Sequence, residues 1–518
     1  MTGMRTIVCM RGFLASSIGV TCAAALALPV ALPSTAAATA AGPPAAGALP
    51  GSTQSLPLAP LGSDRAGGGP RAEGLPRRDV RPFSLLGVVW DDADAELRGT
   101  VQVRTRATGT TVWSAWQDVE THNHEHAADP GAAERGSGRV RGATAPLWVG
   151  DSDGVEVRVR ARGAEPATGA RAGRPDTARD RAPASHAHAS TADAEGRAPA
   201  GDGGGRTSAD GVEGRTPTDG VEGRTSADGA PADGSPGLLP AGLRLELVDP
   251  GAEPPPGGAP ADAPRATTLT AEAAASSAVN ADLAPLGALA VPELTKERTR
   301  ADLLAARGLP GATGARPYVG PRPRIVTRRG WGADERLRER NFAYTKTVKA
   351  AFVHHSATGN NYRCSQAPSV LRSIYRYHVE SSGWRDIGYN FAVDKCGNIY
   401  EGRAGGVAKA VLGAHTLGFN TNSMGIAVLG TYTSAAPPKA AVTAVARLTA
   451  WKLGLFGANP RGTTYLKSGG GNLYSKGTKV RLHVISGHRD GFATECPGRR
   501  LYSKLGTART ASARYQGR

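Results

Sequence analysis

The sequence predicts an α/β domain with a mixed central β-sheet flanked by helices, preceded by a small all-β domain and long disordered linkers. Strand-like and helix-like patterns alternate over residues 324–505, and short runs in which valine alternates with charged residues occupy 81–162. Such alternation is typical of half-buried strands. The intervening stretches are rich in the chain's 69 Gly and 37 Pro, and they bury too little apolar surface to offset their ordering entropy.

The first 38 residues are expected to be a signal peptide. Arg5 and Arg11 precede an apolar run over 13–32, and three alanines follow at 36–38, which is the residue order of a secretory signal. A membrane anchor is the alternative, but Pro29 interrupts the apolar run. No other apolar run approaches the ~20 residues that a membrane span requires. The mature protein is therefore expected to be secreted, with no stable membrane span.

Composition and pattern divide the rest of the chain. Residues 243–248 repeat the alternation of the β-rich domain, so they are the candidate last strand of that domain. The predicted segments are a disordered leader (39–78), the β-rich domain (79–162, completed by 238–250), a low-complexity insertion (163–237), a linker (251–323) with a short helix at 295–307, the α/β domain (324–505) and a C-terminal tail (506–518).

The spacing of apolar residues, and the turn residues between them, predict the secondary structure of the α/β domain. Strands are expected at 350–354, 389–394, 399–401, 424–430 and 480–485, and helices at 368–381 and 438–455.

Aromatic and histidine residues of the β-rich domain carry weaker signals. Four tryptophans could present a sugar-binding face, but core packing of a small sandwich is favoured. Three histidines alternate with other residues in one loop; they could bind a metal adventitiously, but solvated side chains are expected. These residues are Trp90, Trp113, Trp116 and Trp148, and His122, His124 and His126.

The strongest chemical signal is a set of potential metal ligands in the α/β domain. His354 ends a predicted strand, and His488 and Cys496 lie about 130 residues further on. Two imidazoles and one thiolate leave a fourth position open, which is typical of a catalytic zinc because a structural zinc closes its shell with four ligands. This set points to metal-assisted hydrolysis.

The cysteine count agrees with such a site. Cys9 and Cys22 would leave with the signal peptide, so Cys364, Cys396 and Cys496 remain. An odd number in an oxidising compartment requires a reason. The simplest account is a Cys364–Cys396 disulfide together with Cys496 held as a metal thiolate.

The formal charge of +17 is concentrated in one domain. Residues 324–505 contain 27 Lys and Arg against 9 Asp and Glu. A basic exported domain is expected to meet an anionic polymer, and the compartment favours anionic wall polymers over nucleic acid. A charge that only keeps the domain soluble is the alternative.

Ordered motifs run through residues 324–505. They are GWGA (330–333), FVHHSA (352–357), GWRDIGYNF (383–391), GNIYEGR (397–403), GAHT (413–416), NSMGI (422–426) and GHRDGFATECPG (487–498). Together they resemble the motifs of the peptidoglycan recognition protein/type-2 amidase family. The resemblance implies that His354, His488 and Cys496 hold Zn²⁺ and that the substrate is peptidoglycan. The bond cut would be the amide between the lactyl group of N-acetylmuramic acid and L-Ala.

The same resemblance implies roles for further residues. Tyr389 matches the family's catalytic tyrosine, and Thr494 stands where phage members carry a catalytic lysine and many animal amidases a threonine. His415, Arg403 and Asn420 are candidate substrate-groove residues. Two other histidines, His355 and His378, are expected to be structural.

The leading hypothesis is an exported, cell-wall, zinc-dependent N-acetylmuramoyl-L-alanine amidase. The alternative is a non-catalytic peptidoglycan-binding or sensing protein, but family members that only bind tend to lack the cysteine found here at 496. A zinc peptidase is disfavoured because the chain has no His-Glu-x-x-His helix. The β-rich domain is expected to target the enzyme to the wall or to space it there.

Overall fold

The computed structural model describes residues 51–61, 71–121, 123–163, 238–252, 269–310 and 317–518, all of which belong to one compact unit, Ala48–Arg518. The predicted signal peptide (1–38) and nearly all of the predicted insertion (163–237) lie outside the described residues. Within the described ranges, no helix is both long and apolar enough to cross a membrane.

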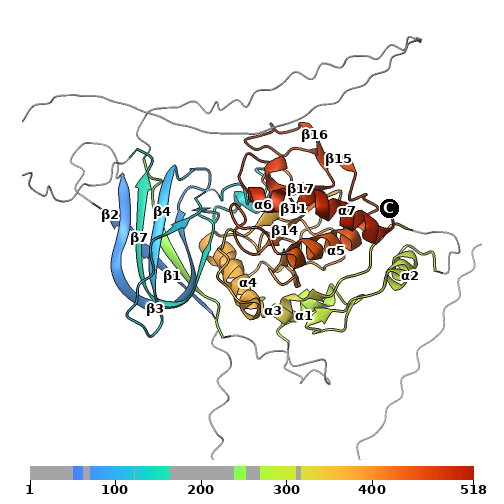
Figure 1. Ribbon diagram of the computed structural model, residues 1–518, viewed down its shortest axis with the longest axis horizontal. Helices are drawn as coiled ribbons and strands as arrows, with labels where there is room; N and C mark the ends of the chain where they lie inside the picture. Colours follow the sequence, from blue (N-terminus) through green and yellow to red (C-terminus); the bar gives the residue numbers. More distant parts are fainter. Residues whose placement is uncertain (1–50, 62–70, 122, 164–237, 253–268, 311–316) are drawn as a thin grey trace, which may run out of the picture. The chain divides into compact units, whose positions relative to one another are not determined.

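An antiparallel sheet builds the β-rich domain (Figure 1). Its described strands run in the order β1, β8, β3, β7, β4, β5, and β2 and β6 pair with β3 outside this path. Alternate valines of β4 and β7 are buried in the core, as their period of two predicts. The strands are β1 (Ser52–Pro57), β2 (Ala59–Pro60), β3 (Ala72–Trp90), β4 (Gly99–Ala107), β5 (Gln117–Val119), β6 (Gly142–Ala143), β7 (Leu147–Ala161) and β8 (Arg244–Asp249).

The prediction of a disordered leader over 39–78 is wrong for β1, β2 and the first residues of β3, which fall in this range and form strands. β1 pairs with β8 along its whole length, and β3 begins at Ala72. β1 lies at the edge of the sheet, where main-chain pairing can hold a strand that buries little apolar surface. Its composition therefore carries no strand signal.

The four tryptophans divide into two environments. Trp90 and Trp148 are buried in the core, as core packing predicts. Trp113 and Trp116 are half-buried, and residues 113–116 form no strand beyond an isolated bridge to Arg106. The Arg158 guanidinium lies 4.0 Å from the centre of the Trp116 ring, within the range of a cation–π contact.

A mixed sheet forms the centre of the α/β domain, which confirms the predicted fold class. Its described strands run in the order β17, β11, β14, β12, β13, β10, β9. β11 pairs in parallel with both β14 and β17, whereas β12 and β13 are antiparallel. The strands are β9 (Ala290–Val291), β10 (Ile325–Val326), β11 (Ala350–His355), β12 (Phe391–Val393), β13 (Ile399–Glu401), β14 (Ser423–Val428) and β17 (Ile485–Gly487).

Helices cover both faces of this sheet. α5 (Lys439–Leu455) and α7 (Leu505–Gln516) lie side by side (Figure 1), and α5 packs with Val353 and Ile426 in one apolar cluster. α4 (Ala367–Arg376) packs with Ala427 in another. Because neighbouring residues of β14 join opposite clusters, the sheet is buried on both faces.

Two segments predicted to be outside the α/β domain belong to its fold. Within the predicted linker (251–323), α1 (Ala271–Ala278) and the predicted helix α2 (Lys296–Ala306) are joined by β9, which extends the central sheet. The predicted tail (506–518) forms most of α7. Its Ser512 accepts a 3.0 Å hydrogen bond from Thr449 of α5. Val291 and Leu303 join the apolar core of the α/β domain, but these short elements bury too few apolar residues to show a period.

The strand predicted over 480–485 is two strands in two sheets. β16 (Lys479–His483) forms a hairpin with β15 (Thr463–Lys467), whereas β17 pairs with β11. Val484 lies between them and donates its backbone N–H to the carbonyl of Gly462 at 3.0 Å. No Gly or Pro marks this break, so the sequence pattern predicts one continuous strand.

The β-rich and α/β domains share one apolar cluster. Leu85 of β3 and Trp148 of β7 pack with Ile374 of α4. The hydroxyl of Tyr377, in the π-helical turn η3 (Tyr377–Ser381) that follows α4, donates to the carbonyl of Thr144 at 3.1 Å. The two domains are therefore joined through a buried core.

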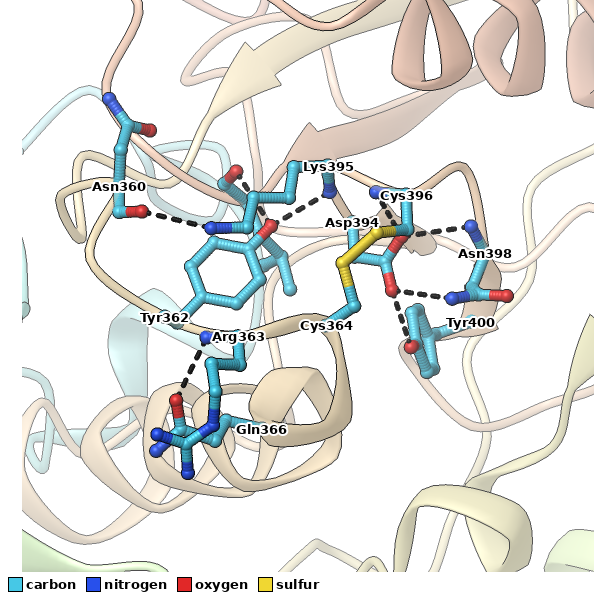
Figure 2. The surroundings of a disulfide bond; sticks show 11 residues. Asn360, Tyr362, Arg363, Cys364, Gln366, Asp394, Lys395, Cys396, Asn398 and Tyr400 are labelled. Carbon is cyan, nitrogen blue, oxygen red and sulfur yellow. Dashed lines mark hydrogen bonds between the residues drawn. A yellow bond between two sulfur atoms is a disulfide. The ribbon is translucent and has the colours of Figure 1, made fainter.

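A disulfide joins Cys364 to Cys396, the pair expected from the sequence (Figure 2). It ties the start of α4 to the turn between β12 and β13. In this turn the Asp394 carboxylate accepts hydrogen bonds from the backbone of Cys396 and from the hydroxyl of Tyr400, each at 2.9 Å.

Candidate metal centre

Two of the predicted ligands stand at the ends of adjacent parallel strands. His354 lies near the end of β11, where Val353 faces the cluster under α5. Because successive side chains of a strand point to opposite faces, His354 faces the other way. β17 runs parallel to β11 and ends at Gly487, so His488 follows it directly. Parallel pairing thus brings both imidazoles to one edge of the sheet.

Cys496 reaches the same place from the loop after His488. Its carbonyl accepts from the backbone of Arg489 at 3.0 Å, and its own N–H donates to the Thr494 hydroxyl at 3.1 Å. These bonds set the sulfur 3.8 Å from Nδ1 of His354. The three side chains named from the sequence therefore converge.

A fourth donor, His126, joins them from the β-rich domain. Its Nε2 lies 3.6 Å from Sγ of Cys496, and one donor atom from each of the four side chains lies within 4.8 Å of the others. The expectation of a solvated loop histidine is wrong here, since His126 is only 5% exposed. The chain carries it across from the β-rich domain into the α/β domain, and this tertiary placement leaves no local signal.

The four side chains suit a soft-to-borderline divalent cation. Burial lowers the pKa of His126, His354 and His488 well below the usual value, and the neutral imidazole is the form that binds metal. Burial also raises the pKa of the Cys496 thiol well above its usual value. A bound cation would reverse that shift by stabilising the thiolate.

Unsatisfied nitrogen atoms point to the same conclusion. Within the described residues, Nδ1 of His126 and both ring nitrogens of His488 have no hydrogen bond of normal geometry, although the backbone of Glu125 lies near enough to favour protonation of His488. Buried polar atoms without partners are costly. Three nitrogens and one sulfur are a ligand set that zinc prefers.

His415 supports His354. The Thr416 hydroxyl lies 3.4 Å from Nε2 of His354 and 3.0 Å from Nδ1 of His415. A Cβ at Gly425 would lie 2.4 Å from the His415 ring, so only glycine leaves room for it. His415 was expected in the substrate groove, but it is fully buried next to His354. Here it can orient a ligand through Thr416.

Tyr389 lies beside the cluster. Its ring centre is 5.5 Å from that of His354 and 5.9 Å from that of His126. Burial raises the pKa of Tyr389 well above its usual value. The hydroxyl therefore stays protonated and can act as a hydrogen-bond donor at the metal centre.

The other candidate residues are paired with the β-rich domain. The Thr494 hydroxyl donates to the Glu125 carboxylate at 2.7 Å. Arg403 makes two hydrogen bonds with Glu134, at 2.8 and 2.9 Å, and both side chains are 7% exposed. The Asn420 amide donates to the carbonyl of Ala127 at 2.8 Å.

Little space remains at this junction. A cavity of about 10 Å³ lies among residues of both domains, including Glu125, His126, Tyr389 and Cys496. Such a volume holds about one water molecule. In this structure, the centre is therefore enclosed.

Two family models match the chain. The model described as "Rv3811 N-terminal galactose-binding domain-like" matches residues 39–189, and the model described as "N-acetylmuramoyl-L-alanine amidase" matches residues 344–499. The second range contains all three ligands named from the sequence.

Known proteins resemble about a third of the chain. Peptidoglycan-recognition protein SC2 of Drosophila simulans is 31% identical over 185 residues, 35% of this chain and 85% of that protein. The N-acetylmuramoyl-L-alanine amidase of Homo sapiens is 32% identical over 194 residues, 36% of this chain and 28% of that protein. The solved structure of wild-type Drosophila PGRP-LB is 26% identical, with a TM-score of 0.29, and the match covers 35% of this chain and 92% of that one.

Proposed function

Because the chain belongs to the peptidoglycan-recognition protein family, we propose that it is a zinc-dependent N-acetylmuramoyl-L-alanine amidase. The substrate would be peptidoglycan, and the reaction would hydrolyse the amide between the lactyl group and L-Ala. The observation that carries this proposal is the convergence of His354, His488 and Cys496 beside Tyr389.

The residues present support amide hydrolysis. Zinc held by the three ligands would activate water and polarise the amide carbonyl. The protonated Tyr389 hydroxyl could donate a hydrogen bond to the developing oxyanion, where a preorganised donor contributes strongly. Thr416 would hold the His354 ring in place. Thr494, already bonded to the backbone N–H of Cys496, would fix the loop that bears the sulfur.

Export to the cell wall belongs to the same proposal. The charged, apolar and small-residue order over residues 1–38 supports a removed signal peptide, and the Cys364–Cys396 disulfide suits an oxidising compartment. The match of the β-rich domain to a galactose-binding-like family supports a role in holding the enzyme on wall glycan. The basic charge of 324–505 would favour anionic wall polymers.

Mass spectrometry of digested muropeptides tests the activity. The zinc-loaded full chain and its His126→Ala variant are incubated with purified muropeptide, and the expected products are a stem peptide with a free L-Ala amino group and the lactyl sugar. Chelation should stop the reaction and zinc should restore it, while Cys496→Ser should be inactive. If neither the full chain nor His126→Ala cleaves the amide at full zinc occupancy, the amidase assignment is wrong.

The second candidate is a non-hydrolytic peptidoglycan receptor. One observation favours it: with His126, four donors surround the centre, and a closed shell of four is typical of structural zinc. A receptor would sediment with purified wall and cleave nothing, even after His126 is removed. An amidase would cleave the lactyl–L-Ala amide in at least one of the two proteins, the wild type or His126→Ala.

A further inference from the structure

One stretch of the β-rich domain, residues 123–134, runs into the metal centre; it is called the groove segment below. It follows β5 and precedes the short turn η1 (Arg135–Ser137) and β6. Both of its ends are therefore tied to the β-rich sheet. Its middle lies against the α/β domain, where the carbonyl of Glu125 accepts from the backbone N–H of Leu417 at 2.9 Å.

The groove segment forms hydrogen bonds with the residues that the sequence assigns to catalysis and substrate contact. Glu125 accepts from Thr494, and Glu134 forms a two-bond ion pair with Arg403. Asp129 accepts from the Asn420 amide at 2.7 Å and from the backbone of Gly418 at 2.9 Å. A substrate that used these donors would have to displace the segment.

Charge favours this docking. Residues 123–134 contain three acidic residues and no Lys or Arg, and they face a domain with 27 basic residues against 9 acidic ones. An anionic peptide ligand would be drawn to the same surface. The carboxylates of the segment thus hold positions that carboxylates of such a ligand could take.

His126 adds the decisive contact. It supplies a third imidazole to two imidazoles and a thiol, all four buried, whereas a hydrolytic zinc needs a position open for water. The cavity of about 10 Å³ beside it leaves no room for a sugar–peptide. Both the coordination shell and the groove are closed in this conformation.

We propose that the groove segment is an intramolecular inhibitor, in which His126 is the fourth metal ligand and Glu125, Asp129 and Glu134 cover the substrate groove. The open state requires the segment to withdraw. Coordination by His126 stands independently of the activity, but the meaning of closure as inhibition rests on the proposed amidase function. A ligand opens the centre only as far as it binds the open state better than the closed one.

Cobalt-substituted full-length protein tests the coordination without any substrate. With Co²⁺ bound, azide should leave the visible spectrum of the wild type unchanged, because no position is exchangeable, and should shift that of His126→Ala. Zinc affinity, measured by competition with a chelator, should fall about tenfold or more in His126→Ala. His124→Ala is the matched control, because His124 is on the same segment but outside the cluster, and it should behave as the wild type. Equal azide binding and equal zinc affinity in the wild type and His126→Ala would overturn the proposal.

Glu134→Gln tests whether the groove segment covers the substrate groove, while leaving all four metal donors in place. It weakens the ion pair to Arg403, so hydrogen exchange in residues 123–134 should become faster. Binding of a purified muramyl peptide to the zinc-loaded protein, followed by calorimetry, should tighten about tenfold. Unchanged exchange together with unchanged muramyl-peptide binding in both Glu134→Gln and His126→Ala would refute the inhibitor role.

The two proposals fail in different ways. If azide reaches cobalt in His126→Ala but that variant does not cleave muropeptide, the amidase function is wrong and the coordination by His126 stands. If the wild type cleaves as fast as His126→Ala and azide reaches its cobalt equally well, the inhibitor is wrong and the amidase stands.

Discussion

Two of the four donors at the metal centre, His354 and His488, stand on or directly after strands of the central sheet of the α/β domain. Cys496 lies on the loop that follows His488, whereas His126 stands on a connection of the β-rich domain. His354 is part of β11, which is paired on both sides by parallel strands. The groove segment that carries His126 is held across the groove by a short set of hydrogen bonds, several of them to side chains.

The residues that bind the metal and the residue that controls access to it are therefore held by the fold with different firmness. Ligands on a paired strand keep their geometry because the ladder and the core fix the backbone, which suits a permanent metal site. A segment outside any sheet opens with a lower free energy than core strands do. The metal centre therefore combines a permanent half, formed by His354, His488 and Cys496, with a removable half, formed by His126 on the groove segment.

The largest expected effect comes from breaking the permanent half. His488→Ala removes a ligand that no other described residue can replace without moving the sheet, so zinc affinity should fall by at least ~100-fold, more than outer partners alone cost. Muropeptide cleavage should be lost with it. Competition with a chelator measures the first and mass spectrometry the second.

A surface histidine provides the control for this variant. His483 of β16 is exposed, and His483→Ala should bind zinc as the wild type does. If His488→Ala kept the zinc affinity of His126→Ala, the proposed division into permanent and removable ligands would be wrong.

A smaller effect is expected from the support behind His354. Thr416→Val keeps the shape but removes the hydroxyl between His354 and His415, so zinc affinity should fall about tenfold. Exchange in the groove segment should not change. Thr449→Val, which removes a buried hydroxyl in α5, is the matched control and should leave zinc binding intact. Equal affinities in the two variants would remove Thr416 from the site.

The sequence predicted the ligands of the permanent half but not His126, the ligand of the removable half. Strand period, helix period and the family motifs predicted β11, α4, α5 and the mixed sheet, because apolar alternation records which face of an element is buried. The motifs also singled out His354, His488 and Cys496, which the structure brings together.

The missed features depend on contacts between distant parts of the chain. α1 buries Ser276, whose hydroxyl donates to Glu335 at 2.7 Å, and a polar anchor of this kind leaves no apolar stripe. His126 sits among acidic and small residues that are typical of loops. The available signal was the pairing of an acidic, histidine-rich stretch with a strongly basic domain, and charge alone does not fix where the two meet.

The smallest expected effect concerns the scaffold rather than the metal centre. Lys452 of α5 is 2% exposed and donates to the carbonyls of Val407 and Lys409, at 2.5 and 2.6 Å. Burial lowers the pKa of Lys452 to about 7. Between that value and the ordinary lysine pKa, the unfolded chain binds a proton that the folded protein does not. The free energy of unfolding should therefore rise with pH in this window, by up to about 1.4 kcal/mol per unit.

Lys452→Met removes this titration and should flatten the slope of stability against pH, measured by urea unfolding at roughly pH 7.5 to 9. This window avoids most of the opposite slope from Glu401, because burial raises the pKa of Glu401 to about 7 and its contribution is lost as pH rises toward that value. Lys439→Met, an exposed lysine on the same helix, should keep the wild-type slope. Zinc affinity should be the same in all three proteins, since Lys452 contacts neither the sheet edge that holds the ligands nor the groove segment. A change in azide access to cobalt in Lys452→Met would instead mean that the core beneath the sheet and the removable half are coupled.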